Sequence, residues 1–119
     1  MCIRDSLLSE GYALIHPIYK STFERRDNIK SDYPDETDEY KNAVIRWGKD
    51  YKRAIDYIQS RDDMDINSLS YYGISWGGSI ANILLAIDDR VKNSVLYVAG
   101  IEFQTCKKEV DKFLSLIHI

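Results

Sequence analysis

The strongest structural signal in this chain of 119 residues is the segment Leu69-Ser70-Tyr71-Tyr72-Gly73-Ile74-Ser75-Trp76-Gly77-Gly78. Its first four residues have the composition of a strand, and the almost unbroken apolar run over residues 80–87 has that of a helix. A Gly-x-Ser-x-Gly sequence lies between the two. We therefore predict a sharp turn from strand to helix with a serine at its centre.

This turn has the layout of a nucleophile elbow, in which a strained serine presents its hydroxyl above a sheet. Gly73 and Gly77 stand two residues before and after Ser75, where the lack of a Cβ gives clearance for the tight turn. The backbone N–H of Trp76 would lie at the N-terminus of the following helix and could stabilise an oxyanion. Ser75 is therefore the candidate nucleophile, and the alternative is a plain glycine-rich turn.

Both ends of the chain resemble translated sequencing-adapter DNA. Residues 114–119 can be encoded by CTG TCT CTT ATA CAC ATC, and residues 1–6 by the reverse complement of that sequence in another frame. One inverted repeat explains both hexapeptides, and it resembles a transposon-end adapter used in sequencing libraries. We expect residues 1–6 and 114–119 to be artefacts, and residues 7–113 to be a partial domain from a longer, metagenomic gene.

The composition is typical of a soluble globular protein, with 45% hydrophobic and 29% charged residues and a net charge of −3. No apolar run approaches the length of a membrane span, and no stripe of Lys and Arg could meet phosphates. We therefore expect no membrane and no nucleic-acid partner. Outside the terminal hexapeptides Cys106 is the one cysteine, so no disulfide framework is expected, which is compatible with a cytoplasmic location. We expect no metal ion and no organic cofactor.

The rest of the chain alternates strand-like and helix-like segments. Short apolar runs typical of buried strands occupy residues 12–16, 69–72 and 94–98. Helical patterns occupy residues 37–59 and the segment after the serine, and a further helix is expected from Lys107. A polar loop is expected over residues 20–38. This order predicts an α/β fold with three parallel strands, flanking helices and right-handed crossovers.

The helix expected over residues 37–59 is amphipathic. Its apolar residues recur at spacings of three and four: Tyr40, Val44, Trp47, Tyr51, Ile55 and Ile58. This stripe should pack against the sheet. The charged residues of the opposite face are expected to form an ordinary solvated surface: Lys41, Arg46, Lys49, Asp50, Lys52, Arg53 and Asp56.

On these motifs, the chain from Gly11 to about Phe113 resembles the central portion of an α/β-hydrolase. Residues 11–17, Gly-Tyr-Ala-Leu-Ile-His-Pro, and residues 72–78 are similar to the dienelactone-hydrolase, acetyl-xylan-esterase and prolyl-oligopeptidase branches of that superfamily. Residues 18–26 are similar to hydrolase-like domains at the ends of some bacterial multi-domain proteins, including serine/threonine kinases. The resemblance implies a partial α/β-hydrolase fold, in a parent that carries other domains.

The resemblance also implies a serine hydrolase that cleaves small carboxylic esters, or peptides, through an acyl-enzyme on Ser75. In the family, an acidic residue and a histidine follow the serine on later loops, and a second oxyanion donor comes from an earlier loop. All three lie outside this chain, so the fragment as given should be inactive. The family's sheet also has a strand between those at 12–16 and 69–72, so these two should stand about 10 Å apart without pairing.

Other candidate residues have less specific roles. Arg25 and Arg26 could reach the rim of a substrate site at the carboxyl ends of the strands, or be two solvated arginines. His16 precedes the serine in chain order and is expected to be structural or pocket-lining rather than a catalytic base. Asp88 and Asp89 are expected to be solvated residues at the far end of the helix that follows the serine.

Two alternatives to a catalyst remain. The first is a non-catalytic α/β-hydrolase-like binding or regulatory domain of a multi-domain bacterial protein. The second is a different parallel α/β protein, in which Ser75 and Trp76 cradle an anionic group at a helix N-terminus. A relaxed backbone at Ser75 would favour the second alternative.

Overall fold

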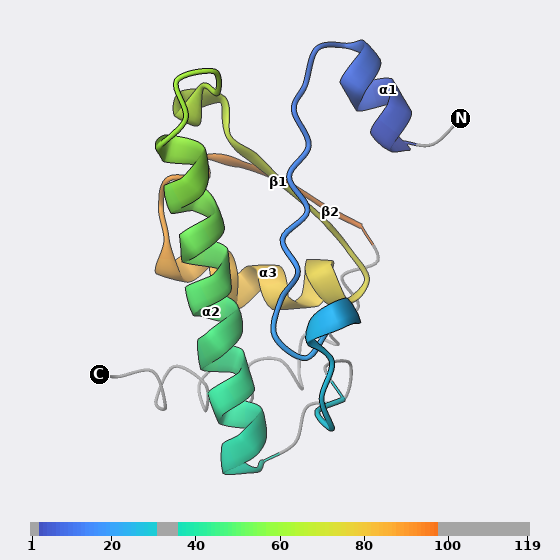
Figure 1. The fold of residues 1–119 in the computed structure, drawn as a ribbon, viewed down its shortest axis with the longest axis vertical. Coiled ribbons are helices and arrows are strands. Elements are labelled where there is room, and N and C mark those ends of the chain that lie inside the picture. Colours follow the sequence, from blue (N-terminus) through green and yellow to red (C-terminus); the bar gives the residue numbers. More distant parts are fainter. Residues whose placement is uncertain (1–2, 31–35, 98–119) are drawn as a thin grey trace.

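The computed structural model describes residues 3–30 and 36–97 of the chain (Figure 1). Its α-helices are α1 (Ile3–Ser9), α2 (Asp38–Gln59) and α3 (Trp76–Ile87). Its strands are β1 (Ser70–Ile74) and β2 (Asn93–Tyr97), and two short 3-10 turns occupy Phe23–Arg25 and Ile66–Ser68.

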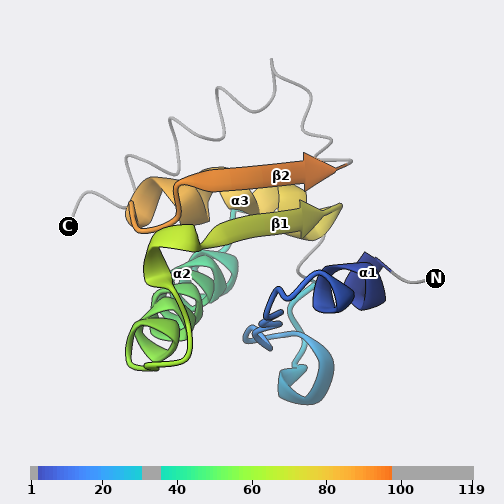
Figure 2. The same cartoon turned by 90° about the horizontal axis from the view of Figure 1, so that it is seen from above.

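The two strands form a small parallel sheet. They pair in register from Ser70 opposite Asn93 to Ile74 opposite Tyr97 (Figure 2). α3 is the crossover that joins the strands, and it packs against both of them. The mixed α/β class expected from the sequence is therefore confirmed, but within the described residues the sheet has two strands rather than three.

The prediction of a strand at residues 12–16 is wrong. This segment carries neither strand nor helix, and it has no ladder partner in the described part of the chain. A strand forms only where a neighbour takes up its N–H and C=O groups, and an apolar composition cannot supply that neighbour. The expected lack of direct pairing with β1 is confirmed, since within the described residues the sheet consists of β1 and β2 alone. The spacing of about 10 Å stays a prediction.

α2 forms as the sequence predicts. Thr37 caps it, because its side chain accepts a hydrogen bond from the Tyr40 N–H at 3.1 Å. Every residue of the predicted apolar stripe is buried: Tyr40, Val44, Trp47, Tyr51, Ile55 and Ile58. This face packs on α3, which crosses behind α2 in Figure 1, and Trp47, Ile55 and Leu84 are the largest fully buried side chains.

The two faces of the sheet have different surroundings. β1 directs Tyr71 toward the core formed by α2 and α3. On the opposite face, Tyr72 and Ile74 are 42% and 48% exposed, and their partners Val95 and Tyr97 are 60% and 64% exposed. Within the described residues, the helices therefore cover one face of the sheet.

The start of the expected loop over residues 20–38 is fixed against α2. Asp50 accepts hydrogen bonds from the Lys20 backbone N–H at 2.8 Å and from the Arg25 guanidinium at 2.7 Å. The Trp47 indole N–H donates to the Lys20 carbonyl. Asp50 was expected to belong to an ordinary solvated surface. Instead it is half-buried and anchors the loop to α2. Charge patterning could not reveal this role, because both partners of Asp50 come from a distant part of the sequence.

The first helix crosses a predicted boundary. α1 runs from Ile3 to Ser9 and so joins residues of the expected adapter hexapeptide to those of the expected domain. The origin of residues 1–6 stays a prediction, and the helix expected from Lys107 and the hexapeptide 114–119 lie outside the described residues. No helix within the described ranges has both the length and the apolar character that crossing a bilayer requires.

Candidate functional site

Ser75 occupies a strained turn between β1 and α3. Its backbone has φ 52° and ψ −117°, a conformation that costs a non-glycine residue about 1–3 kcal/mol. Two hydrogen bonds hold it there. The Ser75 N–H donates to the Tyr97 carbonyl at 3.0 Å, and the Ser75 carbonyl accepts from the Ser79 N–H at 2.9 Å. The backbone at this position is therefore fixed from both the sheet and the helix.

The Ser75 side chain is exposed and does not cap the helix that it precedes. A serine at this position commonly caps the helix through its hydroxyl, which stabilises a protein by about 1 kcal/mol. Here neither the cap nor a relaxed backbone is present. The turn therefore presents a hydroxyl to solvent at a cost in stability, which is typical of functional positions.

The two glycines of the motif have different surroundings. A Cβ built on Gly73 would lie 2.6 Å from the Gly77 carbonyl oxygen and 2.7 Å from Cε1 of Tyr71, too close for any side chain. A Cβ on Gly77 would meet only the Tyr71 hydroxyl oxygen at 3.8 Å, an ordinary contact. The expectation that both glycines provide clearance is thus correct for Gly73 and wrong for Gly77, because α3 starts with room beside Gly77.

Tyr71 links the strand before the serine turn to the helix after it. Its hydroxyl donates a 2.7 Å hydrogen bond to the Gly77 carbonyl in the first turn of α3, and its ring meets the Tyr51 ring with centroids 6.1 Å apart. Burial raises the pKa of Tyr71 to about 12, so the hydroxyl stays protonated and able to donate near neutral pH. Sequence reasoning missed this residue, although a tyrosine at an inward position of a short strand is a signal for a buried hydrogen bond.

Trp76, the first residue of α3, has its backbone N–H at the helix N-terminus. Its indole packs edge-on against Trp47 of α2 and against Tyr19, with ring centroids 5.2 Å and 5.7 Å apart. The structure shows that it packs in an aromatic cluster, which ties the serine turn to α2 and to the N-terminal segment.

The other candidates are not brought to the serine by any hydrogen bond in the described part of the chain. Arg25 donates to the Ile18 carbonyl at 2.8 Å and pairs with Asp50, so it holds its own loop to α2. Arg26 is exposed, and the rim role of both arginines stays a prediction. His16 is exposed and packs edge-on against Phe23, with ring centroids 5.9 Å apart.

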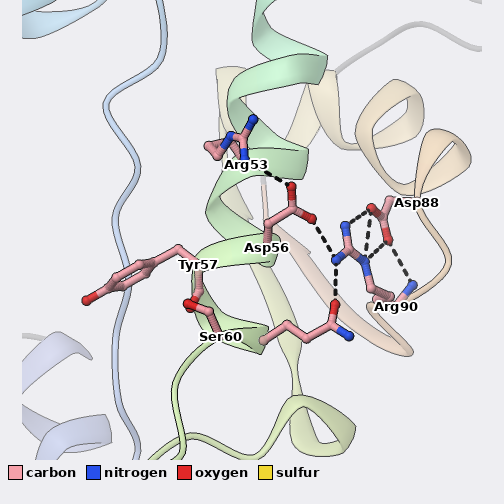
Figure 3. A network of polar contacts seen from close by, with 7 residues as sticks. Arg53, Asp56, Tyr57, Ser60, Asp88 and Arg90 are labelled. Atoms are coloured by element: carbon pink, nitrogen blue, oxygen red, sulfur yellow. Dashed lines mark hydrogen bonds and ion pairs between the residues drawn. The ribbon is translucent and has the colours of Figure 1, made fainter.

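The prediction that Asp88 is a solvated residue is wrong. Its side chain is only 5% exposed, and Arg90 donates to it from both the backbone N–H and the guanidinium, which lowers the Asp88 pKa. The same guanidinium donates to Asp56 and Gln59 of α2, each at 2.9 Å (Figure 3). Asp88 is therefore part of a structural network rather than a solvated helix end, whereas Asp89 is exposed as expected. This network lies at the end of α3 opposite to the serine.

The described surface has open depressions away from the serine. One open depression lies between Lys52 and Arg90, and a second lies between Lys20 and Arg46; Ser75 lines neither. Among the residues in the described ranges, no three His, Cys, Asp or Glu side chains gather in a way that could hold a metal ion. The serine turn is thus the feature with the clearest chemical capacity in this part of the chain.

The fold and the turn together define a small parallel α/β unit with an exposed serine in a strained strand-to-helix turn. The chain is 32% identical over 91 residues to the Bacillus subtilis (strain 168) protein named "Putative hydrolase YtaP". The alignment covers 74% of this chain but 30% of that protein, so the chain spans less than a third of its relative's length. No family model and no solved structure matches the chain.

Proposed function

We propose that this chain is part of a serine hydrolase in which Ser75 attacks the carbonyl carbon of a small carboxylic ester, or of a peptide. The observation that carries the proposal is the strained backbone of Ser75, at φ 52° and ψ −117°. The residue is exposed, and its side chain does not cap α3. The similarity to a protein named a hydrolase supports the same class of activity. We also propose that the turn at Ser75 is a nucleophile elbow and that the chain is part of an α/β-hydrolase fold.

The proposed reaction has two steps. A base removes the Ser75 proton as Oγ bonds to the acyl carbon, and the Trp76 N–H donates to the oxygen that becomes negative. The protonated base then gives this proton to the alcohol or amine that leaves as the tetrahedral intermediate collapses to an acyl-enzyme. The same base next takes a proton from water as the water attacks the acyl carbon, and returns it to Ser75 Oγ when the carboxylic acid leaves. The protein needs no cofactor for this chemistry.

The base and its acidic partner are proposed to come from the longer protein. Within the described residues, no histidine or carboxylate hydrogen-bonds to the Ser75 hydroxyl. In the α/β-hydrolases that the sequence resembles, these groups follow the serine in the chain. A serine hydroxyl without a base is a weak nucleophile, so this chain alone should react slowly, whereas the full-length parent should react fast.

Labelling with a fluorophosphonate tests the proposal. The parent protein should become labelled, Ser75→Ala should abolish the label, and Ser70→Ala, at an exposed position of β1, should leave it intact. This chain alone should label weakly. A parent that keeps its label after Ser75→Ala would refute the role of Ser75, and strong labelling of this chain alone would refute the need for an external base.

A second candidate function is a non-catalytic binding or regulatory domain with the same turn. The observation in its favour is that the Ser75 hydroxyl has no acid–base partner in the described part of the chain. Sequencing the flanking DNA separates the two candidates. An acidic residue and a histidine on downstream loops favour the hydrolase, and their absence from the whole gene favours the binding domain.

A further inference from the structure

The turn that carries Ser75 is closed by a residue outside the Gly-x-Ser-x-Gly motif. Tyr71 is the second residue of β1, and its hydroxyl donates a hydrogen bond to the Gly77 carbonyl at 2.7 Å. This bond joins the strand to the first turn of α3, and Ser75 lies inside the loop that it closes. The Gly77 carbonyl is also the group that approaches Gly73 most closely, so Tyr71 fixes the tightest point of the turn.

A strained residue keeps its conformation only where the surrounding structure restrains it on several sides. The N–H and the carbonyl of Ser75 are held by Tyr97 and Ser79 respectively. Neither bond joins a residue of β1 directly to a residue of α3. The hydrogen bond from Tyr71 does so, because its donor is on the strand and its acceptor is on the helix.

We infer that Tyr71 is a positioning residue for Ser75: its hydrogen bond to the Gly77 carbonyl keeps the first turn of α3 against β1 and so presents the Ser75 hydroxyl. This inference rests on the proposed function of Ser75 as a nucleophile. A phenylalanine would fill the same space, so the hydroxyl is the part of the side chain with this role.

Two neighbouring tyrosines supply matched controls. Tyr72 follows Tyr71 in β1 but points to the other face of the sheet, where it is 42% exposed. Tyr51 touches the Tyr71 ring and is buried, but its hydroxyl has no hydrogen-bond partner in the described part of the chain. Tyr→Phe at either position removes a hydroxyl from the same type of residue without removing a bond across the turn.

The test uses Ser75→Cys in the 119-residue chain with Cys2→Ser and Cys106→Ser, so that one thiol reports on the turn without needing a catalytic base. Its rate of reaction with a small aromatic disulfide, followed against pH, gives the thiolate pKa. A thiol held at a helix N-terminus titrates below the ordinary value of about 8.5. Adding Tyr71→Phe should raise this pKa and lower the rate at pH 7 at least about threefold. Tyr72→Phe and Tyr51→Phe should leave both unchanged.

An unchanged pH profile in a folded Tyr71→Phe protein would overturn the inference, and so would an equal shift in the two controls. If Tyr71→Phe alone fails to fold, the comparison is made with Gly77→Ala present throughout, since that position has room for a methyl group and keeps its carbonyl. Fluorophosphonate labelling of the parent is independent of this result. A parent that does not label refutes the hydrolase, whereas an unchanged pH profile of the introduced thiol refutes the role of Tyr71.

Discussion

The two glycines around Ser75 should respond in opposite directions to the same substitution. In Gly73→Ala the new methyl carbon would lie 2.6 Å from the Gly77 carbonyl oxygen, where an ordinary contact begins at 3.4 Å, so α3 must move by about 0.8 Å. Such overpacking costs about 1–3 kcal/mol. The displacement also strains the bond from Tyr71 to that carbonyl, which is worth about 0.5–1.5 kcal/mol. We expect Gly73→Ala to lower the free energy of unfolding by about 2–4 kcal/mol.

Gly77→Ala is the matched control. Its methyl group would meet only the Tyr71 hydroxyl oxygen at 3.8 Å, and alanine is a better helix former than glycine by about 0.5–1 kcal/mol. We expect this variant to be as stable as the unsubstituted chain or more stable. Urea unfolding followed by the fluorescence of Trp47 and Trp76, the two tryptophans of the chain, measures both changes. Equal losses in the two variants, or a loss below about 0.5 kcal/mol in Gly73→Ala, would refute this view of the turn.

Three further predictions concern stability. Ser75→Gly should raise the free energy of unfolding by about 1 kcal/mol, because glycine accepts the positive φ without strain, whereas Ser75→Ala should stay within about 0.5 kcal/mol of the unsubstituted chain; urea midpoints of the two variants test this. Asp88→Asn should cost about 1–3 kcal/mol through its buried ion pair, and Asp89→Asn, on the exposed neighbour, less than about 0.5 kcal/mol in the same assay. Burial raises the pKa of Tyr51 and Tyr71 from 10.0 to about 12, so above pH 10 the unfolded chain loses protons that the native state keeps. The free energy of unfolding from urea titrations should therefore not depend on these groups below pH 10 and should fall above it, by about 1 kcal/mol per pH unit for each tyrosine; a free energy that rises above pH 10 would contradict the burial of these hydroxyls.

The sequence predicted the elements whose signals are local. α2 follows from a repeated spacing of apolar residues and from the cap at Thr37, and all of this lies within one segment. The serine turn follows from a short motif with a strand before it and a helix after it. Neither prediction needs to know what the segment packs against.

The predictions that failed depend on contacts between distant segments. Residues 12–16 have the composition of a strand, but a strand also needs a neighbour with free hydrogen-bonding groups. Asp50 looks like a surface charge in the sequence, but its partner Arg25 is 25 residues away. Asp88 pairs with the nearby Arg90, whose guanidinium also reaches back to Asp56 of α2, and this second contact is not visible in the local sequence. Tyr71 was missed for the same reason, since a side chain that bonds across a turn is visible only once the turn exists.

If Ser75 is the proposed nucleophile, a fluorophosphonate should modify this residue in the full-length parent. The most direct measurement is tandem mass spectrometry of the full-length parent after reaction with a fluorophosphonate, with the modified residue assigned by fragmentation. We expect one adduct per chain, on the Ser75 side chain. An adduct on a different residue, or an unmodified parent, would contradict it.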